Sequence, residues 1–383
     1  MLLHGARKLD ADGILDDFWM VFAGDTIAAT GTGSAWQALA PSIPAEERVD
    51  ARGRWVTPGF VDVHGHGGGG ASFDDGPDAM RIALDAHRAH GTTRSVLSLV
   101  SNPLPDLVAS LRQVAQLAGR DPLVLGSHLE GPFLSPLHRG AHDPDHLVHP
   151  EPAAVEMLLE ASGGTLRQIT IAPELPGALD AIDRFVAAGV VVAVGHTDAG
   201  LELTRQAFDR GATVLTHAFN AMPGIHHRAP GPVVAAFDDP RVALELILDG
   251  VHVHPDVARL CFVAAPQRVL LVSDAMAAAA SHDGEYRLGS LDVTVVEGEA
   301  MLSGTQTLAG STLTLDTALR TAIEHANIDP VLAVRALTAS PARALGLDDR
   351  LGYLSTGYAA DAVLLDAGWH ATDVFANGAR IVP

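Results

Sequence analysis

The stretch Pro58-Gly-Phe-Val-Asp-Val-His-Gly-His-Gly67 is a short apolar run that ends in two histidines and then in glycine. An apolar run bounded by proline and glycine is typical of a buried strand. Because residues two apart on a strand point to the same face, His64 and His66 should lie side by side. Neutral imidazole is a good ligand for zinc or iron. This stretch therefore predicts a strand that presents a pair of metal ligands where it ends.

Seven further aliphatic runs follow, and segments of helical period separate them. Together with residues 55–63, the strand candidates are residues 92–99, 123–129, 167–172, 190–195, 212–216, 242–248 and 268–273. The helices expected between them cover residues 78–90, 103–117, 152–161, 177–188, 201–210 and 255–264. Strands that alternate with helices build a parallel sheet. Eight of them predict an α/β fold closed into a (β/α)₈ TIM-like barrel.

Both ends of the chain have a different texture, with short alternating runs and glycine or aspartate turns. Neither end could form a stable sheet alone. We therefore expect one small β-sandwich domain built from residues 1–54 plus 346–383, and a metal-dependent catalytic barrel over residues 55–345. Residues 286–302 predict a hairpin inserted after the eighth strand.

Composition and charge exclude several classes of partner. With 48% hydrophobic and 19% charged residues, the chain can bury a large core. A formal net charge of −21 argues against nucleic acid, which is bound mainly through Lys and Arg. The same charge repels anionic ligands, so a phosphorylated substrate would need a locally cationic pocket. The single cysteine, Cys261, and the lack of a signal peptide or long apolar run predict a cytoplasmic protein with no membrane partner.

Titratable residues stand at the ends of five of the eight predicted strands. Barrel enzymes carry their reactive groups at the carboxyl ends of the strands, which all open at one mouth. These residues predict a metal site in which the first ion is held by Glu130, His196 and His217. A second ion would lie at His64 and His66 and share Glu130.

Asp274 ends the eighth strand and is either a further ligand or the general acid and base. A metal lowers the pKa of bound water toward about 7, and a neighbouring carboxylate can take the proton that the attacking water loses. An amine leaves poorly until its nitrogen is protonated. One aspartate that returns this proton explains both halves of an amide hydrolysis.

Several motifs carry a family resemblance along nearly the whole chain. They are Pro58–Gly67 as quoted, His128-Leu-Glu-Gly-Pro-Phe133, Gly195-His-Thr197, Thr216-His-Ala-Phe-Asn-Ala-Met222, Asp249-Gly-Val-His252, Ser273-Asp-Ala275 and Thr307-Leu-Ala-Gly-Ser311. In these motifs the chain resembles the amidohydrolase superfamily and, within it, the family of N-acetylglucosamine-6-phosphate deacetylases. The resemblance implies metal-dependent removal of an acetyl group from a phosphorylated amino sugar.

The resemblance also implies roles for individual residues. Glu130, His196 and His217 match the principal metal ligands, and Asp274 matches the catalytic aspartate. His252 would contact the sugar and help to polarise the acetyl carbonyl. The remaining substrate-binding positions would be Ala141, His142, Asn220, Ala221, Arg228, Leu308, Ala309 and Gly310.

The resemblance further implies a cofactor and an assembly. The cofactor would be one or two divalent ions per subunit, zinc first and Fe²⁺ or another first-row ion as the alternative. Arg228 would bind the substrate phosphate. Its loop would reach the neighbouring subunit's site in a homodimer.

Other hypotheses make different demands on the sequence. Dihydroorotases and hydantoinases use a modified lysine after the fourth strand, and residues 167–174 contain no lysine. Adenosine-type deaminases fit the Glu130 motif poorly. A scaffold barrel without activity predicts loss of a ligand or of Asp274, yet all are present. A deacetylase of another N-acyl amino sugar, such as N-acetylgalactosamine 6-phosphate, stays open.

Overall fold

The computed structural model describes residues 1–382, which form two compact units. The first unit contains Met1–Asp62, His87–Arg94 and the chain from Leu315 onward. The second unit contains Val63–Ala86 and Ser95–Thr314. All the metal ligands and substrate-contacting residues predicted above belong to the second unit.

Eight parallel strands form one sheet in which strands that follow each other in the chain are neighbours. Their order is β15-β14-β13-β12-β11-β10-β9-β6. The strands are β6 (Phe60–Asp62), β9 (Thr92–Leu99), β10 (Val124–Glu130), β11 (Leu166–Ile171), β12 (Val191–Val194), β13 (Val214–Leu215), β14 (Ala243–Ile247) and β15 (Val269–Val272). Just beyond the first and eighth strands, the backbone N–H of Asp274 donates to the carbonyl of His64 at 2.8 Å. This nearly closed sheet confirms the predicted barrel.

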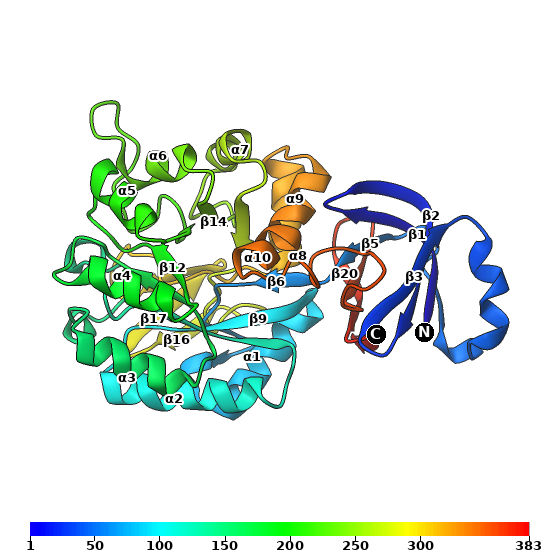
Figure 1. The fold of residues 1–383 in the computed structure, drawn as a ribbon, viewed down its shortest axis with the longest axis horizontal. Coiled ribbons are helices and arrows are strands. Elements are labelled where there is room, and N and C mark those ends of the chain that lie inside the picture. The colour runs from blue at the N-terminus through cyan, green and yellow to red at the C-terminus, as the bar shows by residue number, and fades with distance from the viewer. Residues whose placement is uncertain (383) are drawn as a thin grey trace. The chain divides into compact units, whose positions relative to one another are not determined.

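Amphipathic helices follow the strands, and Figure 1 shows α2 to α6 around them. In α2, the buried residues Leu107, Leu111, Val114 and Leu117 recur every three or four positions, so one face packs inward. The helices are α1 (Pro77–Ala89), α2 (Leu104–Ala118), α3 (Pro152–Ser162), α4 (Ala178–Ala187), α5 (Leu201–Asp209), α6 (Gly231–Asp238), α7 (Pro255–Ala264), α8 (Leu315–Arg320), α9 (Pro330–Leu337) and α10 (Ala339–Ala344).

Strands from both ends of the chain form a separate sheet, seen as the blue and red strands of Figure 1. Its order is β21-β20-β19-β5-β1-β2-β3, and β4 pairs with β1. Phe18, Phe22 and Phe375 lie in its hydrophobic core. The strands are β1 (Leu2–Asp10), β2 (Gly13–Ala23), β3 (Thr26–Thr32), β4 (Arg48–Asp50), β5 (Trp55–Pro58), β19 (Ala362–Leu365), β20 (Ala371–Ala376) and β21 (Ala379–Val382).

The strand expected over residues 55–63 is two strands, so this prediction was wrong in detail. β5 pairs with β1 and β19 in the terminal sheet, whereas β6 belongs to the barrel sheet. The break falls at Gly59, directly after Pro58, the last residue of β5. Proline has no backbone N–H to continue a ladder. Gly59 lies where an added Cβ would collide with the side chain of Thr93.

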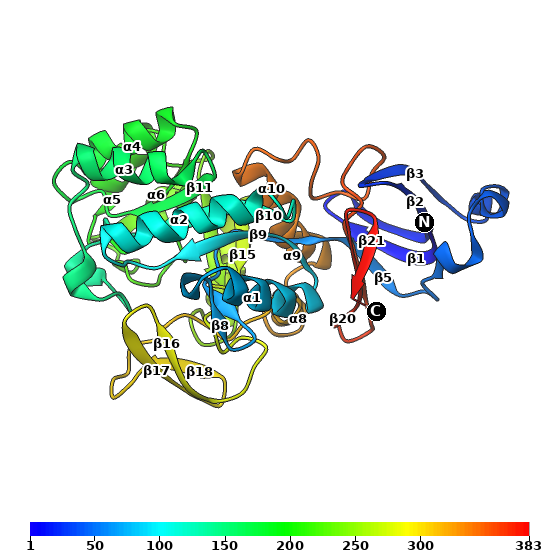
Figure 2. The ribbon, with the colours of Figure 1, turned by 90° about the horizontal axis from the view of Figure 1, so that it is seen from below.

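The insertion after the eighth strand is larger than the predicted hairpin. It is a three-stranded antiparallel sheet of β16 (Gly284–Leu288), β17 (Leu291–Val296) and β18 (Glu299–Leu302), shown in yellow in Figure 2. A two-stranded ribbon, β7 (Gly67–Gly68) with β8 (Ala71–Ser72), follows the first barrel strand. Within residues 1–382, no helix is both long enough and apolar enough to cross a membrane.

Candidate active site

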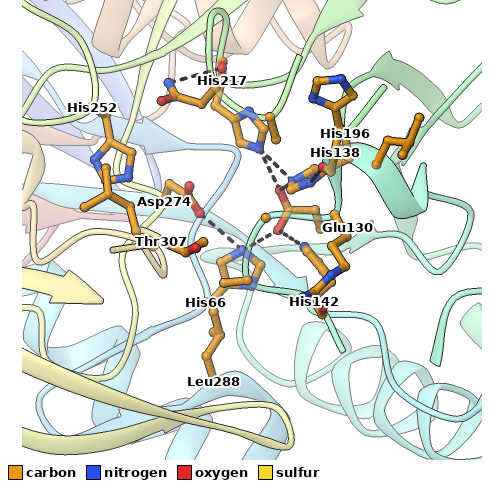
Figure 3. Close-up of a pocket in the computed structure, with 18 of the residues that line it drawn as sticks. His66, Glu130, His138, His142, His196, His217, His252, Asp274, Leu288 and Thr307 are labelled. Carbon is orange, nitrogen blue, oxygen red and sulfur yellow. Dashed lines mark hydrogen bonds and ion pairs between the residues drawn. The ribbon is translucent and has the colours of Figure 1, made fainter. Parts of the chain in front are cut away.

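A cavity of about 520 Å³ opens where the barrel strands end, and Figure 3 shows most of the side chains around it. This volume lies in the range of sites that bind small molecules. The lining residues are His66, Glu130, Pro136, Leu137, His138, Arg139, Gly140, Ala141, His142, His196, His217, Asn220, Ala221, His252, Asp274, Leu288, Gln306, Thr307, Leu308 and Gly310.

Glu130, His196 and His217 form a tight triangle of donor atoms. The Nε2 atoms of His196 and His217 each lie 3.0 Å from Oε1 of Glu130, and 3.0 Å from each other. Tetrahedral zinc with bonds of about 2.0–2.2 Å would separate its ligand atoms by about 3.3 Å. The three residues, far apart in the sequence, therefore stand at the spacing of ligands to one ion.

A second group, made of His64, His66, Glu130 and Asp274, adjoins the first. All four offer ligand atoms within 4.8 Å of one another, and all four residues are buried. Nε2 of His66 lies 3.1 Å from Oε2 of Glu130 and 3.3 Å from Oδ1 of Asp274. Nε2 of His64 lies 3.3 Å from Oε1 of Glu130. Glu130 is thus common to both groups.

The backbone at three of these strand ends is unusual. His196, His217 and Asp274 have positive φ angles of 46°, 24° and 44°. Non-glycine residues rarely adopt such angles, which cost on the order of 1–3 kcal/mol each and cluster at functional sites. Gly195 precedes His196, and a Cβ added to it would lie 2.5 Å from Cβ of Thr216. A side chain at Gly195 therefore has no room between the neighbouring strands, directly before the turn that presents His196.

Charges inside the cluster shift the pKa values of its members strongly. Burial opposes the charged form of His66, but hydrogen bonds to Asp274 and Glu130 raise its pKa to about 9. Burial raises the pKa of Glu130, but the charges of His64 and His196 outweigh it and hold that pKa well below its usual range. Burial lowers the pKa of His196 to about 4.

These donors fit a divalent metal. Ionised carboxylates buried together are costly unless a cation or hydrogen bonds balance them. Histidine nitrogens and carboxylate oxygens are also the ligands that zinc and similar ions prefer. The cluster therefore has the charge, the donor atoms and the spacing of a metal centre.

Most of the predicted substrate-contacting residues line the same cavity. They are Ala141, His142, Asn220, Ala221, His252, Leu308 and Gly310. Nδ1 of His142 lies 2.9 Å from Oγ of Ser101, and Nδ1 of His252 lies 2.6 Å from Oδ2 of Asp249. Nε2 of His142 lies 3.3 Å from Oε2 of Glu130, so this residue also adjoins the metal cluster.

Three predicted residues lie outside the cavity lining. His64 and Ala309 are fully buried, with no exposed surface. Arg228 is exposed, and its guanidinium contacts Nε2 of His227 at 2.7 Å. Within the described part of this single chain, Arg228 therefore does not line the cavity that contains the metal ligands.

The loop after β10 supplies two residues that sequence reasoning missed. The carbonyl oxygen of His138 lies 2.9 Å from Nδ1 of His196. Arg139 is the one Arg or Lys side chain among the lining residues. A sequence signal was present, because both residues stand shortly before the predicted pair Ala141 and His142.

Residues from the inserted sheet and the barrel interior were also missed. Leu288, Gln306 and Thr307 line the cavity. Glu245 contacts His64 from β14, where a charged residue interrupts an otherwise apolar run. That interruption was the available sequence signal.

Comparison with known proteins agrees with this geometry. The model of the amidohydrolase family matches residues 55–381. The chain belongs to the amidohydrolase family. This match covers every strand of the barrel and every residue of the buried cluster. Membership of this family and the cluster's donor atoms together support a divalent metal site.

Individual amidohydrolases resemble the chain over nearly its whole length. An N-acetylgalactosamine-6-phosphate deacetylase from Escherichia coli O157:H7 is 38% identical, covering 98% of each chain. An N-acetylglucosamine-6-phosphate deacetylase from Bos taurus is 36% identical, over 87% of this chain and 85% of its own. A mutant N-acetyl-D-glucosamine-6-phosphate deacetylase from Mycobacterium smegmatis, solved with N-acetyl-D-glucosamine-6-phosphate, superposes with a TM-score of 0.93 at 44% identity. That match covers 100% of this chain and 99% of the other.

Proposed function

We propose that this amidohydrolase hydrolyses the acetamide of N-acetyl-D-glucosamine 6-phosphate to D-glucosamine 6-phosphate and acetate. The observation that carries the proposal is the convergence of Glu130, His196, His217 and Asp274 on one cavity, in a chain whose relatives are deacetylases of amino-sugar phosphates. The second candidate substrate is N-acetylgalactosamine 6-phosphate, which the E. coli relative at 38% identity favours.

The proposed cofactor is Zn²⁺, with Fe²⁺ or another first-row divalent ion as the alternative, and with one or two ions per subunit. Glu130, His196 and His217 would hold the first ion, and His64 and His66 the second. When bound, such an ion polarises the acetyl carbonyl and makes water a stronger nucleophile at neutral pH.

Asp274 is the proposed proton carrier of the reaction. Asp274 lines the cavity and its side chain is 11% exposed, so it can meet both water and substrate. It accepts a proton from the attacking water. It then returns that proton to the amide nitrogen while the bond between carbon and nitrogen breaks.

His252 is proposed to orient the substrate. Asp249 holds Nδ1 of His252 at 2.6 Å, so the ring has a defined orientation. The Nε2 side can then contact the sugar and the acetyl carbonyl. Ala141, His142, Leu308 and Gly310 would surround the sugar ring, with the buried Ala309 between the last two.

Recognition of the phosphate needs positive charge, because the chain as a whole carries a net charge of −21. We assign this role to Arg228 of a neighbouring subunit in a homodimer, with Asn220 and Ala221 on the same side of the substrate. Guanidinium binds phosphate through two parallel hydrogen bonds. Arg139 in the cavity lining offers a second positive charge within the same chain.

The proposal extends to domains and location. Residues 55–345 are proposed as the catalytic domain, and residues 1–54 plus 346–383 as the β-sandwich domain that accompanies it. A cytoplasmic location is proposed because Cys261, the one cysteine of the chain, is buried and unpaired.

The decisive experiment measures acetate release together with metal content. Purified protein is assayed with N-acetylglucosamine 6-phosphate, its unphosphorylated form and the galactosamine epimer. Metal analysis is made on the same sample, and the assay is repeated after chelation and after metal is restored. We expect kcat/KM to be highest for the glucosamine phosphate and activity to depend on metal. A preference for the epimer supports the second candidate, and no acetate from any of the three rejects both.

A further inference from the structure

Glu245 is a buried acidic residue within β14 that the proposed mechanism does not use. Its side chain has no exposure to solvent. A carboxylate in such a place is strongly destabilising unless hydrogen bonds or a charge partner compensate for lost water. The groups that supply this compensation indicate what Glu245 does.

Three donors from different parts of the barrel meet this carboxylate. The side-chain amide of Gln168, on β11, donates to Oε1 at 2.8 Å. Oε2 lies 3.0 Å from Nδ1 of His64 and 3.3 Å from the backbone N–H of His217. Inward-pointing side chains of different barrel strands meet in shared layers. Glu245, on the seventh strand, therefore reaches Gln168 on the fourth strand. It also reaches His64 and His217, which follow the first and sixth strands.

We propose that Glu245 is a positioning residue that sets the tautomer and orientation of His64 for metal binding, a role that rests on the metal site proposed above. A carboxylate can only accept from Nδ1, so the ring proton of neutral His64 lies on that atom. Nε2 then turns its lone pair toward the group of His66, Glu130 and Asp274. A carboxylate behind a ligating histidine also makes the imidazole a stronger donor to the ion.

The other histidines of the cluster lack such a carboxylate. Nδ1 of His196 lies 2.9 Å from the carbonyl oxygen of His138, which is uncharged. Among the described residues, Nδ1 of His66 and Nδ1 of His217 have no hydrogen-bond partner. Loss of the Glu245 carboxylate should therefore weaken the ion at His64 and His66 selectively.

The test titrates metal-free protein with Zn²⁺ against a competing chelator, which gives the number of ions and the Kd of each. In Glu245→Gln we expect the Kd of the ion at His64 and His66 to rise about 10- to 100-fold. The ion at Glu130, His196 and His217 should change by less than about threefold. The control Gln168→Leu removes another donor to the same carboxylate but spares His64, so both Kd values should stay near wild type.

A double-mutant cycle separates positioning from general destabilisation. In a His64→Ala background, Glu245→Gln should cause no further loss of metal affinity, because the ring it positions is gone. Equal losses in both backgrounds would overturn the proposal, as would wild-type affinity in Glu245→Gln or a wild-type protein that binds a single ion. Acetate release by the wild type is measured separately, so failure of the proposed reaction is distinguishable from failure of this role.

A measurement on the wild type decides the question if Glu245→Gln does not fold. Nitrogen NMR of ¹⁵N-histidine-labelled, Zn²⁺-loaded protein reports which ring nitrogen carries the proton. The signal that disappears in His64→Ala is assigned to His64. We expect a proton on Nδ1 with the metal on Nε2. The reverse arrangement contradicts the proposal.

Discussion

Oδ1 of Asp274 lies 3.3 Å from Nε2 of His66, although the two residues are separated by seven strands of the barrel sheet. The contact exists because the ends of the first and eighth strands are joined by backbone hydrogen bonds, including the one from the N–H of His66 to the carbonyl of Ala275 at 2.7 Å. Barrel closure thus brings the proposed proton carrier to the proposed metal ligands.

Replacement of Asp274 by Asn should abolish proton transfer while leaving most of the donor atoms in place. We expect kcat for acetate release to fall about 100- to 10,000-fold, the usual contribution of a general acid and base. The ion at Glu130, His196 and His217 should remain, because Asp274 is not part of that triangle. Elemental analysis and steady-state kinetics of the same sample check both points. Full activity in Asp274→Asn would exclude the aspartate as proton carrier.

Arg228→Ala should reduce kcat/KM for the phosphorylated substrate roughly 10- to 100-fold, since hydrogen bonds to charged groups are worth about 1.5–3 kcal/mol each. The unphosphorylated substrate should be hydrolysed at an unchanged rate. Arg139→Ala is the comparison within the cavity. If it alone removes the preference for phosphate, the phosphate binds to the subunit's own arginine.

The supply of Arg228 by a neighbouring subunit has its own test. Arg228→Ala and Asp274→Asn chains are each impaired, but a mixed dimer contains one site with an intact aspartate and an intact partner arginine. We expect mixing after subunit exchange to recover activity that neither variant shows alone. Absence of recovery, with exchange verified by mass spectrometry, argues for recognition within one subunit.

Gly195→Ala should destabilise the barrel because the new methyl would overlap Thr216 and would lie 2.9 Å from Cγ2 of Thr170. Overpacking of this kind costs about 1–3 kcal/mol. Gly224→Ala is the matched control, since an added Cβ there meets nothing within 4 Å. Thermal or denaturant unfolding should show a clear loss of stability for Gly195→Ala and little change for the control. Similar losses in both variants would contradict the packing argument.

The pair of His90 and Asp316 predicts a pH dependence of stability that is independent of the metal cluster. Nδ1 of His90 lies 3.1 Å from both carboxylate oxygens, and this hydrogen bond raises the pKa of His90 despite partial burial. Because the pKa of His90 is raised in the folded protein, protonation of His90 stabilises the fold. This stabilisation is complete at pH values below the unfolded pKa of about 6.5. This contribution is lost as pH rises through the higher folded pKa.

His90→Gln removes that titration and gives the measurement. Below about pH 6 the wild type should be the more stable protein, by less than about 1 kcal/mol because the pair is partly exposed. The difference in Tm between the two proteins should shrink toward alkaline pH. A constant difference across this range would show that protonation of His90 contributes nothing.

Much of the fold could be predicted because its signals are local. Apolar runs of strand length alternate with helical periods, and the buried positions of α2 have the spacing that one packed face requires. The split of residues 55–63 was not predicted, since an apolar run does not reveal which sheet each half joins. Two sheets compete for that run, and the outcome depends on pairing with β1 and β19.

The chain's residues alone determined the barrel, the chemical type of the site and the presence of histidine and carboxylate ligands at strand ends. Tertiary structure decided the rest. Glu245 contacts His64 across the barrel, and Arg139 lines the cavity while Arg228 does not. The physical reason is that periodicity records which face of a strand is buried, whereas a contact between residues 181 positions apart depends on how the whole sheet closes.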